Sequence, residues 1–260
     1  MNLLVLNGSY RKNGNTAQVT EQIVTQFRAL AESRSASVTV ETVHLGHVNI
    51  EPCRGCRICF DRGEEYCPVK DGIPALRAKM RQADAVLIAS PVYVDDVNGI
   101  TKNFIDRMAF ACHRPEFAGK SAYLLATVGG SPTGHTLRTL GSAFSTWGFS
   151  IAGQKGFKTG ALMKPGEAKQ FEQQTAKIAR ELFDALEQKK ALNPSFLSLM
   201  TFKIQQHAWT AHPDESVDYN YWNDHGWTNP RCDFYIPHRA GRVKVLLARG
   251  LGRIIAPFVV

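Results

Sequence analysis

The chain has 260 residues, of which 44% are hydrophobic and 21% charged, and its formal net charge is +8. No stretch is apolar for long enough to span a membrane, and the apolar run at the N-terminus is too short for a signal peptide, so we expect a cytoplasmic protein. The basic residues are mostly dispersed among polar ones, which favours a solvated surface over a nucleic-acid-binding face.

Short runs rich in Val, Ile and Leu alternate with longer segments of helical periodicity. This alternation predicts βαβ units around a five-stranded parallel sheet, in a doubly wound three-layer α/β sandwich. The predicted strands, in chain order, are residues 2–7, 37–45, 85–90, 121–128 and 149–157. The predicted helices are residues 15–33, 73–82, 99–112, 133–147 and 166–189.

The pattern changes near Lys190. We predict a domain over residues 1–190, with a cysteine-rich insertion at 52–71, and a C-terminal extension over 191–260. The extension contains no further βαβ unit. We expect it to be helical and to pack on the core or on a partner subunit, where it could also cover the active site. An aromatic cluster in the extension is interpreted as packing; its members are Tyr219, Tyr221, Trp222 and Trp227.

The last part of the extension is basic, since no acidic residue follows Asp233. Basic residues among apolar ones could lie on an anionic membrane. Gly250, Gly252 and Pro257 disfavour a helix there, and we interpret the segment as packing on the protein instead.

Three loops follow predicted strands at what would be one edge of the sheet, because the carboxyl ends of parallel strands meet there. Residues 7–16 (NGSYRKNGNT) combine glycines, polar side chains and the start of a helix, which together suit a phosphate group. Residues 90–108 (SPVYVDDVNGITKNFIDRM) place an aromatic face at Tyr93. Residues 127–136 (TVGGSPTGHT) expose backbone amides. Neither a Walker A loop nor a G-x-G-x-x-G pattern is present, which favours a mononucleotide.

These three loops resemble the flavin-binding loops of the NADPH-dependent FMN reductase branch of the flavodoxin superfamily. The resemblance covers about residues 1–190 and implies a flavodoxin-like fold that binds FMN. One departure is Val94, where family members often carry a large aromatic residue. The residues that the resemblance implies for FMN are Ser9, Arg11, Asn15 and Thr16 at the phosphate, Pro91, Val92, Tyr93 and Val94 along the ribityl chain and ring, and Gly129 and Gly130 at the isoalloxazine edge.

Four of the six cysteines lie in the segment PCRGCRICFDRGEEYCPVKD, residues 52–71. They are Cys53, Cys56, Cys59 and Cys67. The C-x2-C-x2-C spacing and the final Cys-Pro are typical of a 4Fe–4S site, whereas structural zinc usually takes two separated pairs. The segment also resembles the cysteine motif of the iron–sulfur flavoprotein subgroup of the same family. A cluster-free loop with a redox disulfide and a zinc site remain alternatives.

We therefore predict an FMN-dependent oxidoreductase that couples FMN to a 4Fe–4S cluster, with NAD(P)H or ferredoxin as the electron donor. No protein acid or base is required, because the cofactors supply the chemistry. The first alternative is a cluster-free NAD(P)H-dependent reductase of FMN, quinones or nitro compounds. The second is a non-catalytic flavin- or zinc-binding interaction protein. By resemblance we also expect a homodimer or tetramer and a small molecule or redox protein as partner.

Overall fold

The computed structural model describes all residues other than 162–165, 188–192, 212–215 and 260. The strands are β1 Asn2–Asn7, β2 Thr39–His44, β3 Ala85–Tyr93, β4 Asp96–Val97, β5 Ser121–Val128 and β6 Ser150–Lys158. The helices are α1 Asn15–Ser33, α2 Ile58–Asp61, α3 Ile73–Gln82, α4 Gly99–Arg107, α5 Gly134–Thr146, α6 Ala168–Glu187, α7 Phe196–Ala211, α8 Val217–Asp224 and α9 Arg242–Val259. Short 3-10 turns are η1 Leu45–His47, η2 Glu64–Tyr66, η3 Ala109–Cys112 and η4 Thr159–Ala161.

Five strands form a parallel sheet in the order β2-β1-β3-β5-β6, which confirms the predicted flavodoxin-like α/β fold. The central strands β1, β3 and β5 are almost continuously buried, as expected for strands covered on both faces. β4 was not predicted. It pairs antiparallel with the end of β3 and makes a short hairpin.

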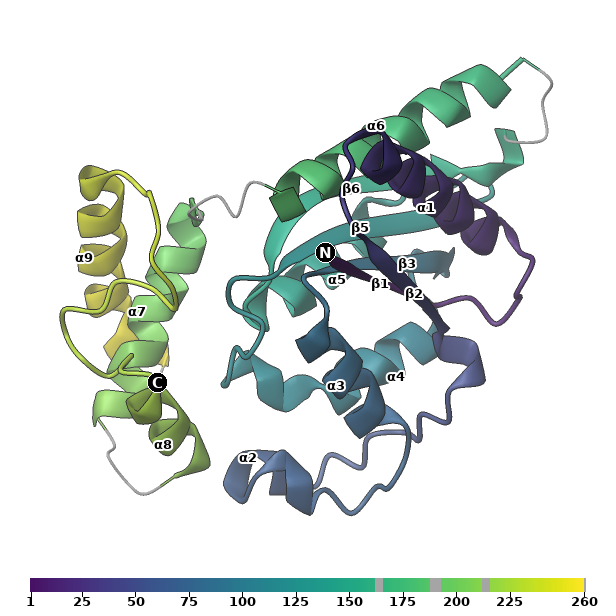
Figure 1. Ribbon diagram of the computed structural model, residues 1–260. Coiled ribbons are helices and arrows are strands. Elements are labelled where there is room, and N and C mark those ends of the chain that lie inside the picture. The colour runs from purple at the N-terminus through teal and green to yellow at the C-terminus, as the bar shows by residue number, and fades with distance from the viewer. Residues whose placement is uncertain (162–165, 188–192, 212–215, 260) are drawn as a thin grey trace.

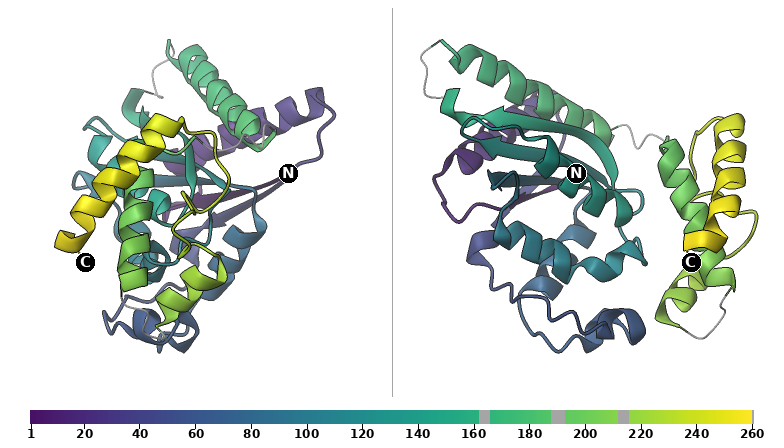
Figure 2. Two further views of the ribbon diagram at one scale, coloured as in Figure 1. Left: turned by 90° about the vertical axis from the view of Figure 1, so that its left-hand side faces the viewer. Right: turned by 180° about the vertical axis from the view of Figure 1, so that it is seen from behind.

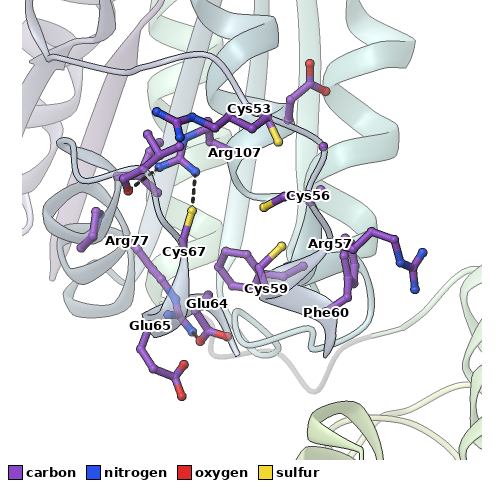
Figure 3. A pocket seen from close by; sticks show the side chains of 18 of the residues that line it. Cys53, Cys56, Arg57, Cys59, Phe60, Glu64, Glu65, Cys67, Arg77 and Arg107 are labelled. Atoms are coloured by element: carbon purple, nitrogen blue, oxygen red, sulfur yellow. Dashed lines mark hydrogen bonds and ion pairs between the residues drawn. The ribbon is translucent and has the colours of Figure 1, made fainter. Parts of the chain in front are cut away.

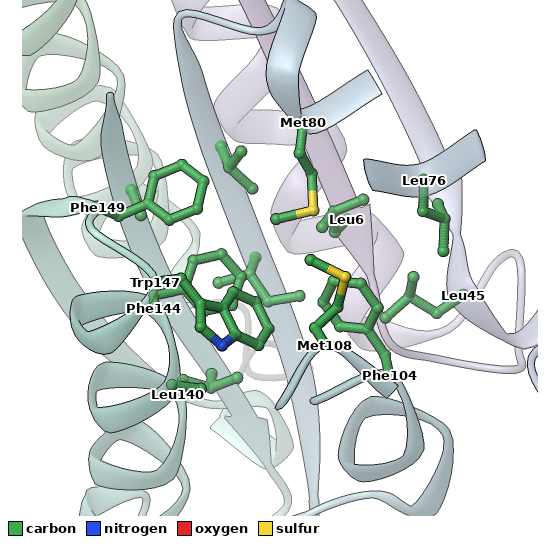
Figure 4. Packing of buried hydrophobic residues seen from close by; sticks show 14 of the residues in the cluster. Leu6, Leu45, Leu76, Met80, Phe104, Met108, Leu140, Phe144, Trp147 and Phe149 are labelled. Carbon is green, nitrogen blue, oxygen red and sulfur yellow. The ribbon is translucent and has the colours of Figure 1, made fainter. Parts of the chain in front are cut away.

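Helices cover both faces of the sheet and complete the three layers (Figure 1). On one face α1 and α6 bury a core around Phe27 and Phe183. On the other face α3, α4 and α5 bury a larger aromatic core in which Phe104, Phe144 and Trp147 are fully covered (Figure 4). The apolar residues recur at helical spacing on α1 and α6, so each helix has one buried stripe and one solvated side.

Helices α7, α8 and α9 form the helical C-terminal region. They share a small core of their own, in which Trp222 and Trp227 are buried, so the packing interpretation of these tryptophans is confirmed. The predicted boundary at 190 falls within 188–192, outside the described residues, and the division into two domains stays a prediction. The last two residues of the predicted helix 166–189 lie outside them as well.

The C-terminal helices lie beside the amino-terminal edge of the sheet, opposite the loops that follow β1, β3 and β5 (Figures 1 and 2). Gln205 of α7 donates to the Cys112 carbonyl, and the Trp222 indole donates to the His113 carbonyl. The region therefore does not cover the predicted flavin loops. Within the described residues, no helix is long and apolar enough to cross a membrane.

Candidate active site

The loops after β1 and β3 are fastened together at the carboxyl edge of the sheet. The Gly8 amide donates to the Ala89 carbonyl at 2.7 Å, and the Asn98 side-chain amide donates to the Gly8 carbonyl at 2.7 Å. The Thr101 hydroxyl donates to Asn98 Oδ1 at 2.7 Å. A Cβ on Gly8 would stand 2.2 Å from Thr101 Oγ1, so only glycine fits this close approach.

The predicted phosphate residues follow in the β1–α1 loop. Ser9 is buried and its Oγ accepts from the Arg11 amide, while the Arg11 side chain is exposed. Helix α1 begins at Asn15, and no side chain caps its start, which leaves the first-turn amides open toward an anion. Thr16 is buried and its hydroxyl lies 2.7 Å from the Thr127 hydroxyl, so it also ties the start of α1 to the end of β5.

The β3–β4 hairpin carries the next predicted group. Pro91 is buried and Val92 partly buried, while Tyr93 is half exposed and Val94 fully exposed at the hairpin tip. Val94 and Asp95 both have positive φ, 48° and 67°, as the two central residues of a type I′ turn do. A β-branched residue is rare in this conformation, so the tip is a strained position beside the predicted flavin site.

Gly129 and Gly130 lie in the loop after β5 and complete the edge. A Cβ on either glycine would meet no other atom within 4 Å, so open space lies beside both Cα atoms. His135 Nδ1 lies 3.7 Å from Asp95 Oδ2, which joins the start of α5 to the hairpin tip. The uncapped start of α1 suits a phosphate. The exposed ring of Tyr93 and the uncovered backbone at Gly129 and Gly130 suit a planar heterocycle.

The cysteine segment forms a curled loop between η1 and α3. Gly55 and Arg57 have φ near +63° and +62°, and Gly63 has φ of 115°, so three residues of this short stretch have positive φ. The two ends of the loop are held to the core: the Asn103 side chain donates to the Ile50 carbonyl at 2.7 Å, and the Gly72 amide donates to the Asn49 carbonyl at 2.8 Å.

The four cysteines line one cavity of about 580 Å³ (Figure 3). Cys53 and Cys56 are exposed, and Cys59 and Cys67 are half-buried; all are free thiols. In the described part of the chain, no three His, Cys, Asp or Glu side chains approach closely enough to hold one metal ion. A single zinc ion would require sulfurs about 2.3 Å from one point. All four cysteines nevertheless border the same cavity (Figure 3).

Arg107, at the end of α4, is the charged residue most closely associated with this cavity. Its Nη1 donates to Cys67 Sγ at 3.1 Å, and its other nitrogens bind both carboxylate oxygens of Asp71. Nη2 also donates to the Val69 carbonyl. Both side chains of the ion pair are buried, so the guanidinium holds a positive charge against the Cys67 sulfur.

A second cationic group supports the other half of the loop. Arg114 donates to the Cys59 carbonyl at 2.6 Å and pairs with Glu64 and with Asp218 of α8. Arg77 pairs with Glu64 as well. Burial raises the pKa of the Cys59 thiol and the nearby Cys67 raises it further, whereas Arg114 lowers it. The thiols therefore lie within electrostatic reach of one another.

The structure brings the ten predicted flavin residues to one sheet edge and the four predicted metal ligands to one cavity. Their roles stay predictions. Arg107, Asp71 and Arg114 were not predicted from the sequence. A signal existed for Arg107, because it interrupts an apolar helix face between Phe104 and Met108, both of which are buried.

The model of the NADPH-dependent FMN reductase family matches residues 1–159, and the chain belongs to this family. It is an FMN-dependent oxidoreductase of that family. Among curated relatives, an iron–sulfur flavoprotein of Archaeoglobus fulgidus is 30% identical over 85% of this chain and 96% of its own length. An iron–sulfur flavoprotein of Methanosarcina thermophila is 29% identical over 72% of this chain and 96% of its own.

Solved structures agree on the fold. An oxidoreductase from Corynebacterium diphtheriae matches with a TM-score of 0.55 at 18% identity, over 72% of this chain and 97% of that one. An FMN-dependent NADH-azoreductase from Bacillus anthracis, solved with FMN, matches with a TM-score of 0.53 at 13% identity, over 70% of this chain and 99% of that one.

Proposed function

We propose that this chain is an iron–sulfur flavoprotein, an oxidoreductase that couples FMN at the carboxyl edge of the sheet to a 4Fe–4S cluster in the cysteine cavity. The observation that carries the proposal is the arrangement of Cys53, Cys56, Cys59 and Cys67 around one cavity, with a buried arginine against one sulfur. The names of the curated relatives support it further.

The chain's own residues would bind and orient both groups. The open amides at the start of α1, with Ser9 and Arg11, would hold the FMN phosphate, and Tyr93 and the Gly129–Gly130 edge would border the ring. The four thiolates would hold the cluster. When both are bound, FMN exchanges one or two electrons and the cluster one, so the pair can connect two-electron and one-electron partners.

The charges around the cavity suit a group that becomes more negative on reduction. Arg107 is buried against Cys67, and Arg54 and Arg57 line the same cavity. Positive charge and hydrogen bonds to the sulfurs stabilise the reduced form of a cluster and raise its reduction potential. We propose NAD(P)H or a ferredoxin as the donor. Zinc receives less support, because structural zinc usually takes two separated cysteine or histidine pairs, which this spacing does not provide.

The test is the absorption spectrum of protein purified without oxygen, with iron and acid-labile sulfide analysis. We expect flavin peaks, a broad shoulder that dithionite bleaches, and about four irons per chain, as a cubane cluster requires. Cys67→Ser should lose the iron and the shoulder and keep the flavin.

Cys112→Ser and Cys232→Ser are matched controls, since neither cysteine lines the cavity. Both should keep four irons. Flavin without iron in the wild-type protein would refute the cluster and leave the cluster-free NAD(P)H-dependent reductase as the function. Iron that survives Cys67→Ser but not a control substitution would refute the ligand assignment.

A further inference from the structure

Helix α9 has two apolar faces, and only one of them is used within the chain. The buried face consists of Val245, Ala248, Gly252 and Ala256, which pack toward α7 and its neighbours. Gly252 permits this packing, because a Cβ there would lie 3.0 Å from the Lys203 side chain. The helix therefore forms despite its two glycines and Pro257, which corrects the expectation that these residues disfavour it.

The opposite face of α9 is apolar and exposed to solvent. With 3.6 residues per turn, the exposed side chains fall on one continuous stripe along the whole helix. Their exposed fractions lie between 41% and 85%. The members of this outer stripe are Val243, Leu246, Leu247, Leu251, Ile254 and Phe258. Large exposed apolar surfaces of this kind mark interaction sites.

Basic side chains border the outer stripe on both sides. Arg242 and Arg253 fall along one border and Lys244 along the other, by the same helical spacing. Arg242 and Arg253 are exposed. Arg249, which lies toward the buried face, is instead paired with Asp233. No acidic residue follows Asp233 in the sequence, so nothing on the helix itself balances these charges.

The basic side chains beside the outer stripe distinguish between two binding partners, a second copy of the chain and an anionic lipid surface. A second copy of α9 would place its own arginines and lysine close to Arg242, Arg253 and Lys244. Because α9 carries no carboxylate, these like charges would repel one another. An anionic lipid surface complements them, and long basic side chains reach lipid headgroups while the stripe enters the acyl boundary. We propose that the outer stripe of α9 is a docking surface for an anionic lipid bilayer, with the helix lying in the plane of the interface.

This placement leaves the redox sites accessible. The C-terminal helices lie on the side of the sheet opposite the flavin loops, so a bilayer against α9 would not cover the carboxyl edge (Figure 2). The inference does not depend on the cluster or on the electron donor.

The experiment is sedimentation of the full-length flavoprotein with vesicles of phosphatidylcholine alone or mixed with phosphatidylglycerol. We expect binding to the mixed vesicles and at least tenfold weaker binding to phosphatidylcholine alone. High salt should weaken the binding, since the charges are exposed. Arg242→Gln/Arg253→Gln should weaken it by about 25-fold, because each basic residue near an anionic surface contributes about fivefold.

The matched control for charge is Arg28→Gln/Arg180→Gln, on exposed positions of α1 and α6. It removes the same charge and should leave binding within about twofold. Leu247→Ser/Ile254→Ser tests the stripe and should abolish binding. Circular dichroism and flavin content verify that each variant is folded.

Two outcomes would overturn the proposal. The first is absence of binding to mixed vesicles, or equal binding by the Arg242→Gln/Arg253→Gln variant and the wild type. The second is a wild-type oligomer in solution that Leu247→Ser/Ile254→Ser dissociates, which would assign the stripe to a second copy. The vesicle assay and the iron analysis have separate readouts, so failure of one is distinguishable from failure of the other.

Discussion

Arg107, the last residue of α4, joins this helix to the segment that carries the cysteines. The guanidinium donates hydrogen bonds to Cys67, Asp71 and the Val69 carbonyl. Asp71 also accepts hydrogen bonds from the Glu51 and Ile73 amides. A buried ion pair of this kind is costly to break, since removal of one partner typically destabilises a protein by about 3–5 kcal/mol. A test of its electrostatic role must therefore change both partners.

We expect the double substitution Arg107→Gln/Asp71→Asn to lower the midpoint potential of the proposed cluster. The amide pair can retain hydrogen bonds to each other, but the positive charge against Cys67 is lost. A hydrogen bond from a charged group contributes about 1.5–3 kcal/mol, so for a one-electron couple the expected fall is on the order of 100 mV. The measurement is a potentiometric titration followed by electron paramagnetic resonance.

Arg57→Gln is the matched control for this titration. Arg57 lines the same cavity, but three quarters of its side chain is exposed and water screens its charge. The potential of this variant should change much less than that of the double variant. Equal shifts in the two proteins would show that long-range charge, and not the contact with Cys67, sets the potential.

At the scale of elements, a network of ion pairs joins the cysteine loop to α3, to the loop after η3 and to α8. Glu64 lies at its centre, between Arg77 and Arg114. Burial alone would raise the pKa of Glu64, but its hydrogen bond and the two arginines outweigh that effect, and the pKa is lowered from its usual 4.5. A lowered carboxyl pKa stabilises the folded state above the unfolded pKa, and this stability is lost as pH falls through the folded pKa.

Glu64→Gln should therefore lower the thermal unfolding midpoint at neutral pH, and its difference from the wild type should shrink as pH falls below about 4.5. Thermal melts at a series of pH values measure this. Glu65→Gln is the control, because the neighbouring Glu65 is exposed and the same charge change there should leave the melts unchanged. A difference that stays constant down to acidic pH would contradict the electrostatic origin.

Local patterns in the sequence predicted most elements well. The bounds of β1, α1, α3 and β5 agree with prediction, because runs of buried apolar residues and helix starts are local signals. The β3–β4 hairpin was missed, since its turn places Val94 at positive φ, where valine is disfavoured. The predicted helical C-terminal extension is confirmed, but α9 itself was not expected, because close packing at Gly252 outweighs the low helix propensity of glycine.

In the candidate site too, residues in local motifs were predicted, whereas their distant partners were not. The cysteine spacing and the three loops are short motifs, and the sequence suffices to select those residues. The partners that support them come from distant positions: Asp71 and Arg107 are 36 residues apart, and Arg114 and Asp218 are 104 apart. Nothing local specifies such pairs, because they depend on how α4 and α8 pack against the cysteine loop.

For the whole molecule, α4 sets the separation between the two proposed redox sites. Its first turn, beside Asn98, borders the flavin edge, and its last turn, at Arg107, lines the cysteine cavity. Nine helical residues span about 13 Å, so the two sites lie at opposite ends of one helix. The half-exposed Tyr93 and exposed Val94 leave the flavin edge open to a second chain. By resemblance to the iron–sulfur flavoproteins, we expect a homo-oligomer in which the flavin of one subunit reduces the cluster of its neighbour.

A mixed oligomer tests this expectation. One subunit carries Cys67→Ser and FMN, and so has a flavin and no cluster. The other is the wild-type chain loaded with 5-deazaFMN, which does not transfer single electrons, and so has a cluster and no competent flavin. After subunit exchange, the reduced-cluster resonance should appear on addition of NAD(P)H, and its rate should not change on dilution. Each parent protein alone should show no reduced-cluster resonance on addition of NAD(P)H. A signal that slows in proportion to dilution would indicate collisions between separate molecules, and no signal would place both partners of the transfer within one chain.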